Sequence, residues 1–275
     1  MKGRECKKAY RPAKISKMRF KGVKMQKVYV LSALVIIGLA LFYIFQGCYP
    51  DLMYLFSNAF PPLISGMAVI VSGLSLERYW RKAKGPFSKT WLYFTAGLFF
   101  WFLGEAVWAG YTLILGVEVP YPSIADIFWL AGYIPFFVAL YLYVKIFGGA
   151  LTRKTLVASM MATIVMTVIV TVVLLAPLLT AGEDPVTLVA DFAYPLFDLA
   201  LFSVAHLGLI IFWKGKLAKS WLFINAAIAM DTCADIIFSY ATAQNAYYCG
   251  HMLELLYHFS YLFFMLAFYL HTKEL

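Results

Sequence analysis

Residues 155–179 read TLVASMMATIVMTVIVTVVLLAPLL, a stretch without any charged residue that directly follows Arg153 and Lys154. An α-helix rises about 1.5 Å per residue, so crossing the roughly 30 Å hydrocarbon core of a bilayer takes about 20 apolar residues. The stretch is long enough to cross. It therefore predicts a transmembrane helix that begins beside a basic pair.

The rest of the chain has the same character. It is 63% hydrophobic and only 13% charged, with a mean hydropathy of +0.79, whereas about a quarter of the residues in a soluble domain are charged. We expect an all-α, polytopic membrane protein with no soluble domain. Its eight predicted transmembrane helices are 28–46, 52–76, 90–112, 122–146, 155–179, 187–213, 219–243 and 250–271.

The basic residues predict the orientation. All 23 Lys and Arg residues fall in five segments, at 2–27, 78–89, 145–154, 214–219 and 273. The other loops contain no Lys or Arg, and their charged residues are the acids Asp51, Glu118, Glu183 and Asp184. Lys and Arg concentrate in cytoplasmic loops, and only an even number of helices places all five segments on one side. We therefore expect a multi-pass protein of the cell membrane with both termini in the cytoplasm.

The N-terminal tail, residues 1–27, carries most of the net charge. It holds eleven Lys and Arg residues and one acid, so its charge of +10 exceeds the +9 of the whole chain. Such a segment is attracted to anionic lipid headgroups. Apart from Tyr10 and Phe20 it lacks the interleaved aromatic residues that stack on bases, so we expect no nucleic-acid partner.

The sequence also indicates an internal repeat. Trp91-Leu-Tyr-Phe resembles Trp221-Leu-Phe-Ile at an offset of 130, which also matches Glu105 with Asp235. At an offset of 128, Asp126 matches Glu254. We expect two four-helix halves, 28–146 and 147–275, that run in the same direction across the membrane. Repeats of this kind often place a functional site between the halves.

Seven acids lie inside the predicted helices, where a charge costs about 2.5–3.5 kcal/mol to insert. No Lys or Arg lies at their depth, so protonation, hydrogen bonds, a His partner or a bound cation remain as ways to satisfy them. Six of these acids and a histidine on the same helix stripe as Glu254 are the predicted ligand- or cation-binding residues, namely Glu105, Asp126, Asp198, Asp231, Asp235, Glu254 and His258. The seventh acid is Asp191. 

A divalent metal is one possible cofactor of these groups. Carboxylates alone suit Ca²⁺ or Mg²⁺, and carboxylates with His suit Zn²⁺. The candidate metal ligands are Asp231, Asp235, Glu254 and His258. The alternative is that neutral acids cross-link the helices by hydrogen bonds. Separately, Cys48 and Cys249 lie in the first and last outer loops, where either a disulfide or two free thiols is possible.

The segment Tyr121-Pro-Ser-Ile-Ala-Asp-Ile-Phe-Trp-Leu-Ala-Gly-Tyr-Ile-Pro resembles the PSxADxFxLxGYP signature of multi-helix membrane sensor regions. Such regions precede GGDEF, PAS and histidine-kinase modules. The resemblance extends over about residues 90–272 and implies a sensory or ligand-binding role. Because this sequence ends at Leu275, we expect signalling to need a cytoplasmic partner in trans.

A fainter resemblance is to the eight-helix lysoplasmalogenase family, whose acids on the third and seventh helices correspond to Glu105 and Asp235. The Lys-Pro of that family is missing here. We expect a sensor-like or ligand-binding protein with an outward-opening acidic and aromatic pocket. Two alternatives stay open: an intramembrane lipid hydrolase that uses these acids with or without a metal, and a cation- or proton-coupled transporter.

Overall fold

The computed structural model describes residues 13–82, 85–147, 152–172, 185–213, 215, 217–244 and 246–274. The chain divides into two compact units, Met1–Phe42 and Tyr43–Leu275. The first unit is described from Ala13 as a single helix, α1 (Ala13–Ile44), whose last two residues belong to the second unit. Residues 1–12 of the predicted basic tail lie outside the described part, as do the side chains up to Met25.

The second unit contains only helices in its described residues. After the short helix η1 (Gln46–Cys48) come α2 (Pro50–Lys82), α3 (Pro86–Ala109), the π-helical turn η2 (Gly110–Leu115), α4 (Ile124–Phe147), α5 (Arg153–Val170), α7 (Pro185–Phe212), α8 (Ala218–Ala243) and α9 (Glu254–Glu274). In the described chain seven helices, α1 included, are long and apolar enough to cross a membrane. The prediction of an all-helical polytopic protein is confirmed at this level.

The fifth predicted span, 155–179, is described only in part. Its helix α5 has 18 residues, of which the apolar portion is Leu156–Val170, and residues 173–184 lie outside the described part. The outer-loop acids Glu183 and Asp184 lie there too. The eighth crossing therefore stays a prediction.

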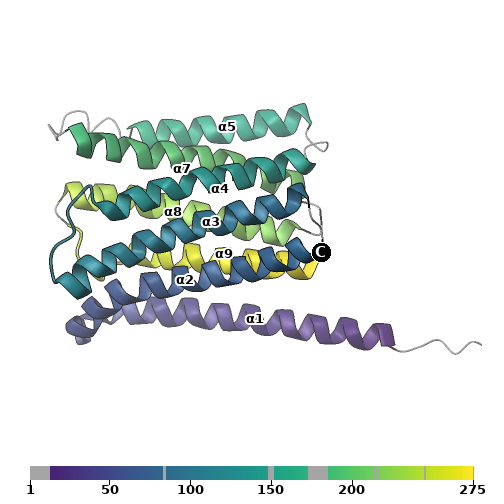
Figure 1. The fold of residues 1–275 in the computed structure, drawn as a ribbon, viewed down its shortest axis with the longest axis horizontal. Helices are drawn as coiled ribbons and strands as arrows, with labels where there is room; N and C mark the ends of the chain where they lie inside the picture. Colours follow the sequence, from purple (N-terminus) through teal and green to yellow (C-terminus); the bar gives the residue numbers. More distant parts are fainter. Residues whose placement is uncertain are drawn as a thin grey trace, which may run out of the picture. The chain divides into compact units, whose positions relative to one another are not determined.

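Six helices of the second unit close a ring. Along the chain, α2 packs on α3, α3 on α4, α7 on α8 and α8 on α9, while α4 contacts α7 and α9 returns to α2. The ring also carries α5, which packs against α7 on the outside (Figure 1). A closed ring has an interior enclosed by side chains from both ends of the sequence, and this is where the polar residues of the spans are buried.

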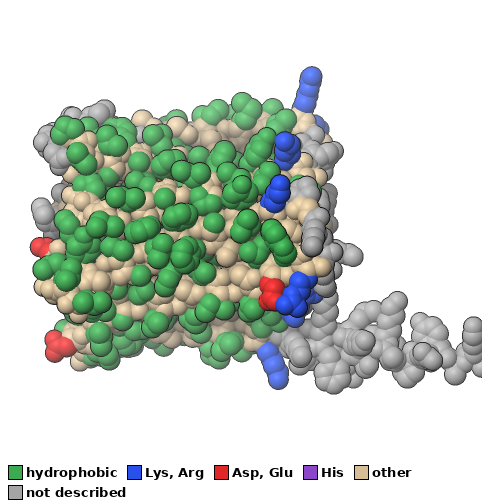
Figure 2. Space-filling view, in the orientation of Figure 1, with side chains coloured by type: hydrophobic (Ala, Val, Ile, Leu, Met, Phe, Trp, Pro, Cys, Tyr) green, Lys and Arg blue, Asp and Glu red, His purple; other side chains and the backbone are tan. Residues whose placement is uncertain are grey.

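Apolar side chains cover the outside of this ring. Leu63, Ile70 and Leu74 of α2 are each more than 60% exposed, and Figure 2 shows hydrophobic side chains across the middle of the visible face. Lys and Arg side chains gather at one end of that face. An apolar outer surface is stable against lipid tails, so the distribution fits a membrane-embedded body.

The helices approach closely where a glycine faces an aromatic ring. Gly97 lies under Phe136, Gly104 under Trp129 and Gly208 under Trp221, and a Cβ atom at any of these glycines would overlap the facing ring. Between helices in a membrane, close packing replaces the hydrophobic effect as the source of stability. At these positions a glycine on one helix therefore leaves room for an aromatic ring of the facing helix.

Candidate functional site

A cavity of about 120 Å³ lies within the second unit. Its walls combine carboxyl groups with tyrosine and tryptophan rings, and no Lys or Arg is among its described lining residues. The lining residues are Ser57, Pro61, Glu105, Trp108, Tyr121, Asp126, Trp129, Tyr133, Tyr194, Asp231, Asp235, Phe238, Ser239, Tyr247, Glu254, Tyr257, His258 and Tyr261. They come from all six ring helices, α7 contributing Tyr194, and from the loops before α4 and α9.

Two of the acids sit in the first turns of their helices. Asp126 of α4 accepts hydrogen bonds from the Ser123 backbone N–H at 2.6 Å and from the Ser123 hydroxyl at 2.9 Å. Glu254 of α9 accepts one from the Gly250 N–H at 2.8 Å. Gly250 has φ +94°, which a residue with a Cβ rarely adopts. Carboxylates are favoured at helix N-termini by the free N–H groups and the helix dipole, so the local sequence places both acids.

Tyrosine hydroxyls, rather than basic side chains, satisfy most of the buried carboxyls. Tyr194 donates to Asp126 at 2.8 Å, and Tyr261 donates to Glu105 at 2.9 Å. Tyr257 donates to one oxygen of Asp235 at 2.6 Å. Among the described residues, none of these acids forms an ion pair with Lys or Arg, since the one such pair there is Arg81 with Glu77.

Two tyrosines from the loops complete this pattern. Tyr121 donates to Asp191, and Tyr247 donates to Glu254 at 3.2 Å. Burial, followed by the nearby carboxyl groups, raises the pKa of both phenols above the ordinary value. Both hydroxyls therefore stay protonated at neutral pH and act as donors.

Glu254 and His258 share a hydrogen-bonded group with Tyr43. The Tyr43 hydroxyl lies 2.7 Å from Glu254 Oε2 and 2.8 Å from His258 Nε2, and Ser57 donates to Glu254 Oε1 at 2.8 Å. Because Tyr43 has one proton, donating it to an ionised Glu254 requires His258 Nε2–H to donate to Tyr43. His258 Nδ1, which is buried without a partner, is then an acceptor.

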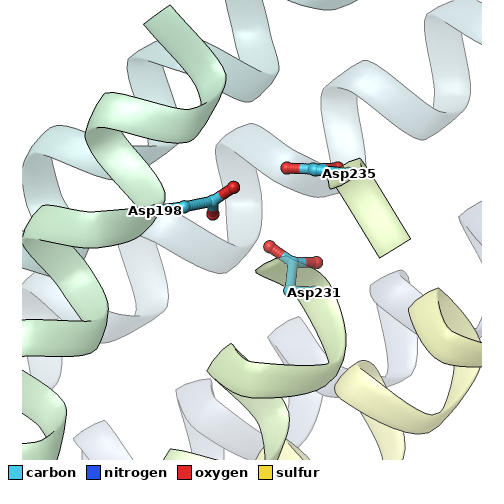
Figure 3. Close-up of side chains that lie close together, drawn as sticks. All are labelled: Asp198, Asp231 and Asp235. Atoms are coloured by element: carbon cyan, nitrogen blue, oxygen red, sulfur yellow. The ribbon is translucent and has the colours of Figure 1, made fainter. Parts of the chain in front are cut away.

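A third group consists of three aspartates near the middles of their helices. Asp198 of α7 and Asp231 and Asp235 of α8 each present an oxygen within 4.8 Å of the other two, and Figure 3 shows their carboxyl groups pointing toward one another. The Tyr133 hydroxyl contacts both Asp198 Oδ1 and Asp235 Oδ2 at 2.9 Å. We call Asp198, Asp231 and Asp235 the aspartate cluster.

Two carboxyl groups of the aspartate cluster, those of Asp198 and Asp231, have oxygens that receive no hydrogen bond from the described residues. Asp198 is 1% exposed, and its Oδ2 atom has no hydrogen-bond partner among those residues. Asp231 is 7% exposed, lines the cavity, and accepts no hydrogen bond within the described part of the chain. Three carboxylates this close repel one another unless they bind protons or a cation.

The structure brings most of the predicted site residues to one place. Glu105, Asp126, Asp231, Asp235, Glu254 and His258 all line the cavity, and Asp198 lies beside Asp231 and Asp235. The four candidate metal ligands are not one cluster: Asp231 and Asp235 are joined by Asp198, whereas Glu254 and His258 surround Tyr43. That these residues bind a ligand stays a prediction.

The predicted last helix, 250–271, is corrected at its start. Helix α9 begins at Glu254, so His251 precedes the helix and its Nδ1 accepts the Leu253 N–H at 3.2 Å. The predicted start at residue 250 extended the helix over the turn that Gly250 makes with its positive φ.

The tyrosines were not singled out as partners of the acids. One signal was present: Glu254, Tyr257, His258 and Tyr261 follow the i, i+3, i+4, i+7 spacing of one helix face. Of the aromatic residues near Glu105 and Asp126 in the sequence, Trp108, Trp129 and Tyr133 line the cavity. Trp101 instead packs into the hydrophobic core.

Cys48 and Cys249 are both free thiols. Of the two arrangements left open by the sequence, the structure therefore has no disulfide between them. Burial raises the pKa of the Cys249 thiol above its ordinary value, whereas the Cys48 side chain is exposed.

Comparisons of the chain with protein-family models, with curated proteins and with solved structures found no match.

Proposed function

We propose that this chain is a multi-pass membrane protein that binds a small molecule in the cavity of its helical ring, in a sensor-like role. The observation that carries the proposal is the cavity itself, which concentrates carboxyl groups and tyrosines inside an apolar body. Ionisable residues at this depth are expensive to keep and usually serve a function. A packing role alone would not require an empty space between them.

The size of the cavity limits the ligand. An engineered apolar cavity of about 150 Å³ holds benzene, so a cavity of about 120 Å³ admits a molecule, or a part of one, with no more than about six non-hydrogen atoms. A small metabolite or the end of a larger molecule meets this limit.

We also propose the full eight-span topology, with both termini in the cytoplasm of the cell. The ends of the described helices support it: Arg78, Arg81, Lys89, Lys145, Arg153, Lys154, Lys219 and Lys273 all lie near helix ends. Exposed acids mark the opposite ends, at Asp51 and Glu118. The positive-inside rule makes the basic face cytoplasmic.

Contacts at matched positions support a four-plus-four repeat. Tyr79 stacks on Trp91 with ring centroids 5.1 Å apart, and Phe212 stacks on Trp221 at 5.3 Å. The sequence alignment of the halves pairs Trp91 with Trp221 and the loop that follows Tyr79 with the loop that follows Phe212. The same packing thus recurs in both halves.

A second matched pair crosses between the halves. Tyr133 donates to Asp235, and Tyr261 donates to Glu105, both at 2.9 Å. The alignment matches Tyr133 with Tyr261 and Glu105 with Asp235. Each half therefore supplies a tyrosine to the acid of the other, as two repeats facing each other across the cavity would do.

A sensor-like role requires that ligand binding change the protein's interaction with something in the cytoplasm, and we propose a signalling partner in trans. The cavity wall includes residues of α2, α3, α4, α7, α8 and α9. A ligand that contacts all six ring helices can bind one packing arrangement of these helices more tightly than another. Such a difference in affinity is what a ligand needs to shift the protein between two conformations.

A hydrolase is the second candidate, because neighbouring carboxyl groups that share protons can activate water. Asp231 and Asp235 offer such a pair on the cavity wall. Purified protein in mild detergent should release product from a lysoplasmalogen if this candidate is correct. Loss of that activity in Asp235→Asn would be required as well.

The binding proposal is tested with a cavity-filling variant. Ser239 lines the cavity, so Ser239→Phe should occupy it, whereas Phe at Cys233, an exposed position on the same helix, should not. The readout is thermal unfolding in mild detergent against a panel of small charged and neutral compounds. We expect at least one compound to stabilise wild type and Cys233→Phe but not Ser239→Phe. Equal shifts in all three proteins, or none, would refute ligand binding in the cavity.

A further inference from the structure

We infer that the cavity takes a cationic group, and that its ligand is a small organic ammonium ion held by Asp231 against an aromatic wall. This inference rests on the proposed function, because it names the chemical class of the ligand in the same cavity.

The polar atoms that face the cavity are mostly acceptors. Tyr257, Tyr261 and Tyr194 each use their single hydroxyl proton on a carboxyl group, so their oxygens can only accept from a ligand. Trp108 also uses its N–H, which donates to Asn58 Oδ1 at 3.2 Å. A ligand that brings N–H or N–CH₃ groups and positive charge complements such a surface, whereas an anion would meet repulsion.

Among the carboxyl groups that line the cavity, Asp231 alone receives no hydrogen bond from the described residues. Glu105, Asp126, Asp235 and Glu254 each accept at least one hydrogen bond from a protein hydroxyl group. Asp231 accepts none within the described part of the chain, although it is 7% exposed and lines the cavity. A buried polar group without a partner is destabilising, so a partner from outside the protein is expected at Asp231.

The surroundings of Asp198 also favour a cation beside Asp231. Its Oδ2 atom is buried and has no hydrogen-bond partner, and its carboxyl group lies within 4.8 Å of oxygens of both Asp231 and Asp235. Figure 3 shows the three groups converging from α7 and α8. A positive charge beside Asp231 would attract all three carboxyl groups and so offset the repulsion within this cluster. It would not need to form a hydrogen bond with each oxygen.

The aromatic wall favours an organic cation over a metal ion. Trp108 and Trp129, with ring centroids 5.9 Å apart, and several tyrosines line the cavity. Aromatic faces attract ammonium groups, and cages of such rings bind quaternary ammonium ions. A hard metal ion instead needs six or more oxygen ligands around about one point, and a cavity of about 120 Å³ leaves most of its space unused.

The aspartates are not needed to build the ring. Upstream, Phe60-Pro-Pro-Leu resembles Tyr194-Pro-Leu-Phe at an offset of 134, which pairs Asp198 with Ile64. The offset of 130 pairs Asp231 with Trp101. Ile64 is 1% exposed and Trp101 is 3% exposed, and both belong to the hydrophobic core. One half thus fills these positions with apolar side chains, which are cheaper to bury. The acids of the other half are best explained by a ligand.

The test compares two compounds of similar size and shape, tetramethylammonium and the neutral tert-butanol, in amine-free buffer. Binding is measured by titrating each compound against thermal unfolding of the purified protein in mild detergent. We expect tetramethylammonium to bind wild type at least tenfold more tightly than tert-butanol, and Asp231→Asn to lose at least tenfold of that affinity. Glu118→Gln, which neutralises an exposed loop acid, should bind as wild type does.

The outcomes separate this inference from the proposal beneath it. If tert-butanol or another neutral compound binds equally well and Ser239→Phe abolishes that binding, the cavity is a ligand site but the ligand is not a cation. Stabilisation by Mg²⁺ or Ca²⁺ without any effect of tetramethylammonium would also overturn the organic class. If no compound of either charge stabilises the protein through the cavity, the proposed function fails together with the inference.

Discussion

Replacing Asp231 with asparagine should stabilise the ligand-free protein. The oxygens of the aspartate cluster lie within 4.8 Å of one another, and two unit charges at that separation repel by about 3.5 kcal/mol at an effective dielectric constant of 20. Asp231 has two such neighbours. Protonation relieves much of this repulsion. The asparagine amide also supplies a donor to a cluster in which Asp198 Oδ2 has none. We expect a net gain of about 1–3 kcal/mol, the usual penalty of an unsatisfied buried polar group.

The assay is thermal unfolding in mild detergent and amine-free phosphate buffer at pH 8, followed by tryptophan fluorescence. A gain of this size corresponds to an unfolding temperature higher by roughly 2–4 °C per kcal/mol. Glu118→Gln, at an exposed position, should leave the temperature unchanged. At pH 5 the gain should shrink, because a protonated carboxyl carries no charge to relieve. Destabilisation of Asp231→Asn at pH 8 would refute the claim that Asp231 lacks a partner.

Two further predictions concern packing and thiol reactivity. Gly208→Ala should destabilise the protein by about 1–3 kcal/mol, because the added Cβ would overlap the buried Trp221 ring. Gly73→Ala, with open space around it, should be neutral or slightly stabilising. The unfolding temperatures of the two variants test this, and equal temperatures would contradict it. In variants that retain one cysteine, Cys249 should react with maleimide at pH 7 more slowly than the exposed Cys48, because burial raises the pKa of the Cys249 thiol and keeps it protonated. The Cys249 rate should increase as the pH rises. Equal rates at pH 7, measured by intact mass, would show that Cys249 is not shielded.

The helical framework was predictable because it depends on local sequence. The predicted helices 122–146 and 219–243 are observed as Ile124–Phe147 and Ala218–Ala243, because apolar runs of this length indicate a spanning helix without reference to any other segment. The boundaries were less exact: α9 begins at Glu254 rather than at residue 250, because Gly250 turns the chain first. A hydropathy pattern is insensitive to such a turn, since Met252 and Leu253 after it are apolar as well.

The acids themselves were also predictable as unusual, because Asp and Glu in apolar helices need partners. Their partners were not. Tyr121 reaches Asp191 and Tyr43 reaches Glu254 across long separations in the sequence, and no local pattern pairs them. For the same reason the sequence grouped Asp231 and Asp235 with Glu254 and His258, whereas the ring of helices brings Asp198 to them instead.

The sequence by itself determined that the protein is helical and apolar and that carboxyl groups lie within its spans, because composition and periodicity act residue by residue. Only the tertiary structure decided which carboxyl groups receive a tyrosine proton and which do not. That outcome depends on which helices are neighbours and on how their side chains meet. Among the described residues, it leaves Asp231 without a donor, facing the cavity.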